Sequence, residues 1–344
     1  MRNVLQVLIV AIIISVSVNA QPPRGGMQGG GMQGGGMMGG PSGRPQGGPG
    51  GQGRGPGGAG MPNIKHESIE PTFKDLAYAT VSAAQKLDIY QPKKLKKASP
   101  VVVYIHGGAF KMGDKAGFMD QTAIKKIVDA GFIVASVNYR LSGEALYPAQ
   151  IQDVKAAIRF LRANADTYLI DTKNIFSWGA SAGGCLSALV ATTADVPELE
   201  GAELGNASFS SRVVAAIDWF GPIDFLSMDE QGEKQGLGIR TNDANSPESQ
   251  LVGGAVQQHA DKCATANAMN YITPDDAAIL IQYGNADRNI PVLQHHNFYK
   301  ALQSVLSADK LKLEVIDGAG HGGPQFDTDE NINKMITFLK KWIV

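Results

Sequence analysis

A chain of 344 residues is long enough for roughly one large or two modest domains, and 43% hydrophobic with 18% charged residues is ordinary for a folded protein. This composition excludes a mainly disordered chain. Residues 1–60 hold four arginines and no acidic residue, so 27 basic and 32 acidic residues remain over 61–344. Because no basic surplus is left to neutralise phosphates, nucleic-acid binding is not expected.

The N-terminus is typical of an export signal. Arg2 precedes an apolar run over residues 4–18, and Val18-Asn19-Ala20 provides a small-residue cleavage site. The run is shorter than the roughly 20 apolar residues that a membrane-spanning helix needs, so we expect a cleaved signal peptide over residues 1–20 rather than a retained anchor. The mature protein is then expected to be secreted or periplasmic, without stable membrane insertion.

Residues 21–62 are rich in Gly, Pro, Met and Gln, and the stretch 21–60 alone contains 20 of the 42 glycines of the chain. Such a segment buries too little apolar surface to offset the entropy of ordering it, so a disordered linker is predicted. The remaining residues, 63–344, have the size of one catalytic domain.

From residue 73 onward, strand-like runs alternate with helical patterns. The strands expected from apolar or alternating runs are 73–80, 85–90, 101–106, 132–138, 175–178, 214–220, 278–283 and 311–316. The expected helices are 122–130, 148–163, 182–191, 291–307 and 330–342. This alternation predicts an α/β fold with a doubly wound, mostly parallel sheet and a functional site at the carboxyl ends of its strands. Residues 226–273 are too long for a simple connection and predict a small cap insertion.

Ser181 stands in the motif Gly179-Ala180-Ser181-Ala182-Gly183, between an expected strand and an apolar helix. In this context G-x-S-x-G forms a sharp turn that exposes the serine hydroxyl above the sheet. A free hydroxyl is a weak nucleophile at neutral pH, so a catalytic serine needs a base.

His321 is the candidate base, because it lies in a glycine-rich loop directly after the last expected strand. The base in turn needs a carboxylate that holds one tautomer. Asp287 follows the strand at 278–283 and gives the chain order Ser, Asp, His. Asp224, after the strand at 214–220, is the alternative acid. Either carboxylate has the simpler role of a turn or helix cap as its competing interpretation.

A second motif, His106-Gly107-Gly108-Ala109-Phe110, follows the strand at 101–106. Its glycines allow the backbone to approach a substrate closely. The amides of Gly108 and Ala109, together with that of Ala182, are the candidate oxyanion donors. The candidate pocket residues are three aromatic side chains, although aromatics beside strands are as often part of the core: Phe110, Trp219 and Phe220.

Two further expectations concern the support of this site. Charged and aromatic residues before and within the helix at 148–163 are expected to form a buried ion-pair and hydrogen-bond framework behind the oxyanion loop: Tyr139, Arg140, Glu144 and Asp153. Cys185, on the helix behind the nucleophile, and Cys263, in the cap, either form a disulfide that ties the cap to this helix or remain buried free thiols.

Together these motifs resemble those of the α/β-hydrolase superfamily, in particular the hormone-sensitive-lipase-like esterases and the bifunctional feruloyl/acetyl esterase-like branch of secreted bacterial hydrolases. The matching segments are QKLDIYQP (85–92), VYIHGGAFKMGDKAG (103–117), the stretch 138–165, WGASAGG (178–184) and GAGHGGPQF (318–326). The resemblance implies a serine ester hydrolase without metal or cofactor, with Ser181, Asp287 and His321 as its triad. Two departures are Ala109, where many relatives have a third glycine, and Tyr283, where histidine is usual.

The expected activity is hydrolysis of short-chain acyl esters, carried on a small molecule or a polymer. Acetyl or feruloyl groups on plant polysaccharide are the targets that the resemblance implies. The cap segment 229–250 is polar, which is poor material for a lid that docks on lipid. A lipase, an amide-directed hydrolase and a catalytically silent binding module on the same fold remain the alternatives, and the oligomeric state is not predicted.

Overall fold

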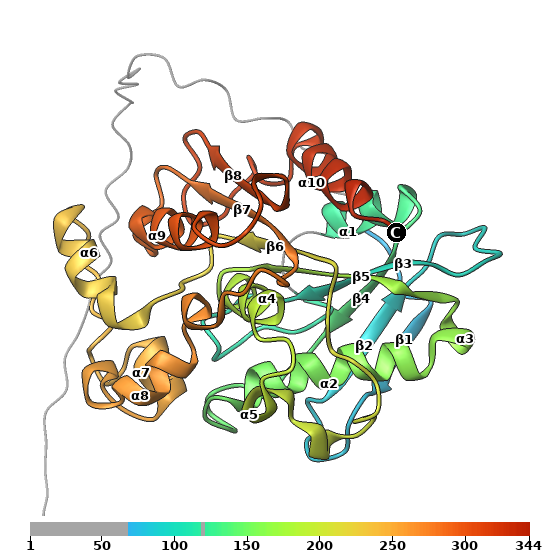
Figure 1. Cartoon of the computed structure of the whole chain (residues 1–344), viewed down its shortest axis with the longest axis horizontal. Helices are drawn as coiled ribbons and strands as arrows, with labels where there is room; N and C mark the ends of the chain where they lie inside the picture. Colours follow the sequence, from blue (N-terminus) through green and yellow to red (C-terminus); the bar gives the residue numbers. More distant parts are fainter. Residues whose placement is uncertain (1–67, 118–120) are drawn as a thin grey trace, which may run out of the picture. The chain divides into compact units, whose positions relative to one another are not determined.

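A computed structural model describes residues 68–117 and 121–344. The expected signal peptide (1–20) and linker (21–62) therefore lie outside the described residues. An eight-stranded sheet organises the described part, in the order β1-β2-β4-β3-β5-β6-β7-β8 (Figure 1). The pairs β1–β2 and β2–β4 are antiparallel and all other pairs are parallel, which confirms the predicted doubly wound, mostly parallel sheet.

The expected strands and helices are present, mostly with small shifts at their ends, although the strand expected at 175–178 already begins at Ile170. The strands are β1 (Phe73–Ala77), β2 (Lys86–Tyr90), β3 (Ser99–Ile105), β4 (Ile133–Val137), β5 (Ile170–Ala180), β6 (Ala215–Trp219), β7 (Ala278–Gly284) and β8 (Leu311–Ile316). The helices of the body are α1 (Gln121–Asp129), α2 (Ala149–Ala163), α3 (Ala165–Tyr168), α4 (Ala182–Thr192), α5 (Pro197–Glu200), α9 (Val292–Gln303) and α10 (Asp329–Lys341). Within the described ranges, no helix is long and apolar enough to cross a membrane.

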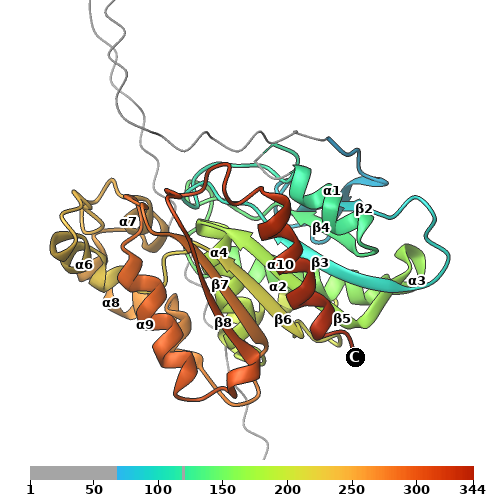
Figure 2. The same cartoon turned by 90° about the horizontal axis from the view of Figure 1, so that it is seen from above.

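Strand β3 shows why the sequence folds into a sheet that is covered on both faces. Val101, Val103 and Ile105 pack with residues of α2, α4 and α9 in one core cluster. The alternate residues Val102 and Tyr104 pack with α1 and α10 in a second cluster (Figure 2). Successive side chains of a strand point to opposite faces, so an unbroken apolar run is required where helices cover both.

The residues expected to form a cap lie between β6 and β7 and fold into three short helices. These are α6 (Met228–Lys234), α7 (Pro247–Val252) and α8 (Ala260–Thr265), which lie together at one end of the sheet in both views (Figures 1 and 2). The cap carries one of the two cysteines of the chain, Cys263, and α4 carries the other, Cys185. Both thiols are buried and free, so the structure contains no bridge between cap and α4.

Candidate active site

Ser181 occupies the sharp turn between β5 and α4. Its backbone has φ 56° and ψ −120°, a conformation that non-glycine residues rarely adopt and that accompanies functional turns. A Cβ at Gly179 would lie 2.1 Å from the carbonyl oxygen of Gly183, and one at Gly183 would lie 2.0 Å from that of Ile105. Only glycine fits at these two positions, which lets the turn close and present the Ser181 hydroxyl at the carboxyl end of the strand.

The structure brings the three residues of the expected triad together. Ser181 Oγ lies 2.7 Å from His321 Nε2, and His321 Nδ1 lies 2.8 Å from Asp287 Oδ2. The other carboxyl oxygen, Oδ1, accepts hydrogen bonds from the amides of Asn289 (2.7 Å) and Ile290 (3.1 Å). With Nδ1–H donating to the carboxylate, Nε2 is left as the acceptor for the Ser181 proton.

Asp287 is held in its ionised form by its surroundings. Burial raises the pKa of its carboxyl, but the hydrogen bond and charge of His321 and the two backbone amides outweigh this effect, so the pKa lies below its usual value. The Asp287 and His321 loops meet because Gly284, at the end of β7, leaves room for the Ala319 carbonyl. A Cβ at Gly284 would lie 2.1 Å from that oxygen.

Asp224, the alternative acid, has another role in the structure. Its side chain caps the short 3₁₀ turn at Phe225–Ser227 by accepting the Leu226 amide at 3.3 Å. Its own amide donates to Gln294 Oε1 at 2.7 Å, which ties this loop to α9. In the described part of the chain Asp224 makes no hydrogen bond or ion pair with His321, so the geometry favours Asp287.

The loop after β3 supplies backbone amides beside Ser181. Gly108 and Ala109 have φ of 111° and 56°, and no protein acceptor takes their amides in the described residues. Ala182 is the first residue of α4, where an amide has no partner within the helix. These three amides are the ones that the sequence indicated as oxyanion donors, and all three residues line the same cavity as Ser181.

His106 supports this loop. Its ring is buried and stacks on Tyr139 with a centroid distance of 4.4 Å, and Tyr139 Oη donates to the His106 carbonyl at 3.0 Å. Burial lowers the pKa of the imidazole, although its contact with the Gly107 carbonyl opposes this. A neutral, packed ring of this kind is suited to holding the loop in place rather than to reacting.

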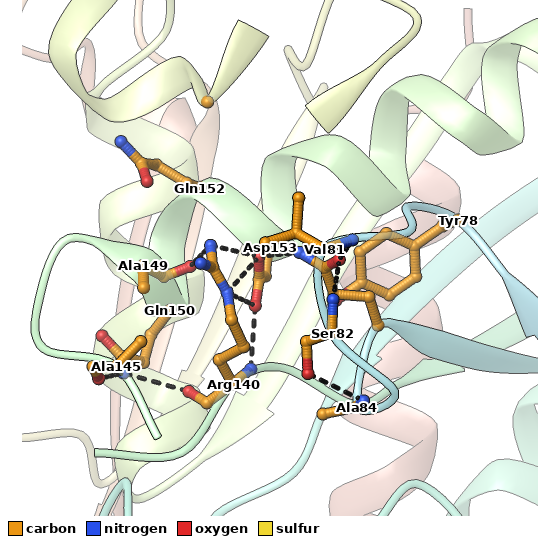
Figure 3. A network of polar contacts seen from close by, with 12 residues as sticks. Tyr78, Val81, Ser82, Ala84, Arg140, Ala145, Ala149, Gln150, Gln152 and Asp153 are labelled. Atoms are coloured by element: carbon orange, nitrogen blue, oxygen red, sulfur yellow. Dashed lines mark hydrogen bonds and ion pairs between the residues drawn. The ribbon is translucent and has the colours of Figure 1, made fainter. Parts of the chain in front are cut away.

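Behind the loop, Arg140 and Asp153 form the core of a polar framework (Figure 3). Arg140 Nη2 lies 2.8 Å from Asp153 Oδ1, and Arg140 Nε lies 2.9 Å from Oδ2. Gln85 Nε2 donates to the same carboxylate at 2.7 Å, which links this framework to the start of β2. Glu144, expected in this framework, is exposed and makes no ion pair with Arg140 in the described residues, although its charge acts on the guanidinium.

A cavity of about 810 Å³ opens above Ser181 and His321, within the usual size range of small-molecule sites. Phe110 and Phe220 line it, and the Phe220 ring meets the His321 ring edge-on at 4.9 Å. Trp219 does not line it. This side chain is fully buried in the core, where its Nε1 donates to Gln282 Oε1 at 2.5 Å, so Trp219 belongs to the packing of the sheet.

The cap forms the opposite wall of the cavity, and the sequence patterns did not identify its residues. The cap residues that line the cavity are Met228, Gly238, Ile239, Arg240, Thr241, Asp243, Asn245, Ser246, Pro247 and Glu248. Most of them are polar, and all of them lie in the first half of the insertion, between residues 228 and 248. No motif marks them, because their place depends on how the cap folds back over the sheet.

Beneath the turn at Ser181, β6 carries a buried carboxyl that the triad does not use. Asp218 Oδ1 accepts the Gly221 amide at 2.8 Å, whereas its Oδ2 is buried and has no hydrogen-bond partner among the described residues. Burial raises the pKa of Asp218 to about 7, and the Gly221 amide opposes this only in part.

We expect Asp218→Asn to stabilise the protein at alkaline pH. Between the unfolded pKa of 3.8 and the folded value of about 7, the unfolded chain ionises while the native carboxyl keeps its proton. Stability is therefore lost as pH rises through this window, and asparagine removes the loss. The difference in unfolding free energy between Asp218→Asn and wild type should be about 2–3 kcal/mol more favourable to the variant at pH 8 than at pH 5, as measured in urea titrations. An equal difference at both pH values would contradict this role of Asp218.

Comparison with known proteins agrees with this architecture. The model of the BD-FAE family matches residues 87–302. Esterase LipC of Mycobacterium tuberculosis is 31% identical over 240 residues, which cover 70% of this chain and 57% of LipC. The chain spans about half the length of the curated relatives that it matches.

Two solved structures are also similar. A bifunctional GH43-CE protein of Bacteroides eggerthii is 38% identical with a TM-score of 0.71, over 78% of this chain and 35% of that protein. A truncated carbohydrate esterase from gut microbiota is 34% identical with a TM-score of 0.72, over 80% of this chain and 98% of its own. The order of the sheet and the similar structures show that the chain has the α/β-hydrolase fold. The family model matches more than half of the residues, so the chain belongs to the BD-FAE family.

Proposed function

We propose that this protein is a serine carboxylic ester hydrolase that removes short acyl groups, such as acetyl or feruloyl, from carbohydrate. The observation that carries the proposal is the continuous chain of contacts from Ser181 through His321 to Asp287 at the floor of an open cavity. The names of its relatives, an esterase and a carbohydrate esterase among them, support the same chemistry.

In the proposed first step, His321 Nε2 takes the proton of Ser181 as Oγ attacks the ester carbonyl carbon. Asp287 holds the Nδ1–H and stabilises the positive charge that forms on the imidazole. The carbonyl oxygen becomes negative and faces the amides of Gly108, Ala109 and Ala182. Each such donor lowers the barrier by roughly 3 kcal/mol in sites of this type.

The second half of the reaction repeats this path with water. His321 passes its proton to the alcohol oxygen as the tetrahedral intermediate collapses, which leaves an acyl group on Ser181. Water then loses a proton to His321 and attacks the acyl carbon, and collapse of the second intermediate returns the proton to Ser181. No further reactant is needed for either half.

The outer surface of the cap supports a soluble rather than a lipid substrate. None of the strongly exposed large apolar side chains in the described residues lies within 226–273. A lid that binds a lipid interface needs such a surface. The export predicted for residues 1–20 belongs to the same proposal, since it would bring the enzyme to extracellular polymers.

A series of p-nitrophenyl esters from acetate to palmitate tests the proposed substrate class. We expect kcat/KM to be highest for acyl chains of two to about four carbons and to fall steeply beyond them, because most of the cap residues that line the cavity are polar. A maximum at long chains, with a rise in rate once the ester forms droplets, would indicate a lipase instead.

The same assay separates the remaining alternatives. A matched pair of aryl acetate and aryl acetamide distinguishes an esterase from an amide-directed hydrolase, and we expect the ester to react faster by several orders of magnitude. Absence of turnover on every ester of the series would leave a binding module on the hydrolase fold as the better interpretation.

A further inference from the structure

Glu248 is a buried carboxyl beside the proposed catalytic centre that the triad does not use. It stands in the first turn of α7, after Ser246 and Pro247, and lines the same cavity as Ser181 and His321. The residue is only 8% exposed. It is therefore the one carboxyl that the cap contributes to the cavity from a buried position among the described residues, since Asp243 at the cavity wall is exposed.

No other side chain in the described residues pairs with the Glu248 carboxyl. In the described part of the chain its carboxyl makes no ion pair, and the hydrogen bond that it receives comes from its own backbone amide. Burial raises its pKa, opposed by that amide and by the charge of His321, while Asp229 acts in the same direction as burial. An unpaired carboxyl in such a place is costly to keep.

A place at a helix start does not explain this burial. Acidic residues in a first helical turn gain from the helix dipole at exposed as well as partly buried positions, but this gain is small beside the cost of burying a charge. The other two glutamates of the cap, Glu230 and Glu233 on α6, are exposed, and Glu230 pairs with Lys234 at 2.5 Å. Of these three glutamates only Glu248 is buried and lines the cavity.

We infer that Glu248 is a specificity-determining residue that accepts a hydrogen bond from a hydroxyl group on the alcohol part of the bound ester. The inference rests on the proposed esterase function of this cavity and names the feature that selects its substrate. A polyhydroxylated alcohol such as a sugar supplies the missing partner, whereas a plain alkyl alcohol leaves the carboxyl desolvated and unpaired. Sites built around a polar partner reject analogues that lack it.

The assignment to the alcohol part follows from the direction of the reaction. His321 Nε2 has to reach the oxygen of the departing alcohol, so the alcohol lies on the His321 side of the cavity. Glu248 lines the same cavity as His321, on the wall that the cap contributes, and we assign its carboxyl to this side. The amides of Gly108 and Ala109 serve the carbonyl oxygen instead.

Three acetates that share the acyl group and a six-membered ring test this inference. They are cyclohexyl acetate and the monoacetates of cis- and trans-1,2-cyclohexanediol, which add one neighbouring hydroxyl as a sugar ring does. We expect wild type to favour at least one hydroxylated acetate over cyclohexyl acetate by about tenfold in kcat/KM. In Glu248→Met the ratio of kcat/KM for the hydroxylated acetate to kcat/KM for cyclohexyl acetate should fall to about one. Glu248→Gln keeps an acceptor oxygen but loses the charge, so its ratio should lie between those of wild type and Glu248→Met.

Two controls exclude a general effect of charge or folding. Glu233→Gln removes the same charge from an exposed position of the cap outside the cavity and should keep the wild-type preference. Glu248→Met should also raise the thermal midpoint by roughly 2–4 °C, because it removes a buried unpaired carboxyl. A merely structural role of Glu248 predicts a lower midpoint.

The outcomes separate this inference from the proposed function. If wild type hydrolyses none of the three acetates, nor any short aryl ester, the esterase function itself is wrong. If it hydrolyses all three without preference, only the role of Glu248 is overturned. An equal loss of kcat/KM on all three in Glu248→Met also overturns it, since that pattern means that Glu248 acts on His321 rather than on the substrate.

Discussion

Ser181→Ala is expected to reduce turnover of an aryl acetate by on the order of 10⁶-fold, and His321→Ala by a similar factor. The two side chains share one proton through the 2.7 Å contact between Oγ and Nε2, so neither reacts without the other. The double variant should therefore be hardly slower than either single variant. The residual rate then comes from the oxyanion amides and from substrate binding alone.

Covalent labelling provides a second measurement for the same pair. An organophosphonate probe should add one adduct to the wild-type protein and none to Ser181→Ala, as read by intact mass. Ser304→Ala, an exposed serine at the end of α9, is the matched control and should label like wild type. Two results would place the nucleophile elsewhere. One is a double variant whose reduction in turnover equals the product of the two single reductions, and the other is an adduct that persists in Ser181→Ala.

The sheet and the turn at Ser181 were predictable because both depend on local sequence. An apolar run such as that of β3 has to be a strand covered on both faces, and small residues around Ser181 allow only a tight strand-to-helix turn. The start of β5 was missed for the opposite reason. Its first residues, from Ile170 onward, include the exposed Thr172 and Lys173, and polar residues of this kind carry no strand signal.

Side-chain direction was harder to predict than secondary structure. Trp219 and Phe220 are neighbours at the end of β6, and both were expected in the pocket. In the structure the two rings lie beside each other, with centroids 6.3 Å apart, and both contact the Phe326 ring, so the sequence did not distinguish which of them lines the cavity. Phe220, with φ 44°, turns toward His321, whereas Trp219 points into the core toward Gln282.

The cap shows where local sequence carries least information. Its helices have six or seven residues, too few for a clear helical period. Their burial depends on contacts with distant parts of the chain, such as the hydrogen bonds that Tyr147 donates to the Leu251 carbonyl on α7 (3.0 Å) and to the Thr265 carbonyl on α8 (2.6 Å). Nothing in the sequence therefore singled out Glu248, which lines the cavity only through the fold of the cap.

Asp287→Asn is the variant that decides between the two acids, and we expect it to lower kcat by about 10⁴-fold with the fold intact. Asparagine keeps the size of the side chain and an oxygen for the amides of Asn289 and Ile290, but its amide group no longer holds a proton on His321 Nδ1. The imidazole then takes the tautomer that presents N–H to Ser181 and is unable to accept the serine proton.

Asp224→Asn is the matched control for this variant. It makes the same chemical change at the end of the neighbouring strand, where the side-chain oxygen of asparagine still caps the turn at Leu226. Its kcat should stay within about threefold of wild type, because no hydrogen bond joins Asp224 to His321 in the described residues. If instead Asp224→Asn is the more damaging change, the acid follows β6, and the 2.8 Å contact between Asp287 and His321 only positions the loop after β8.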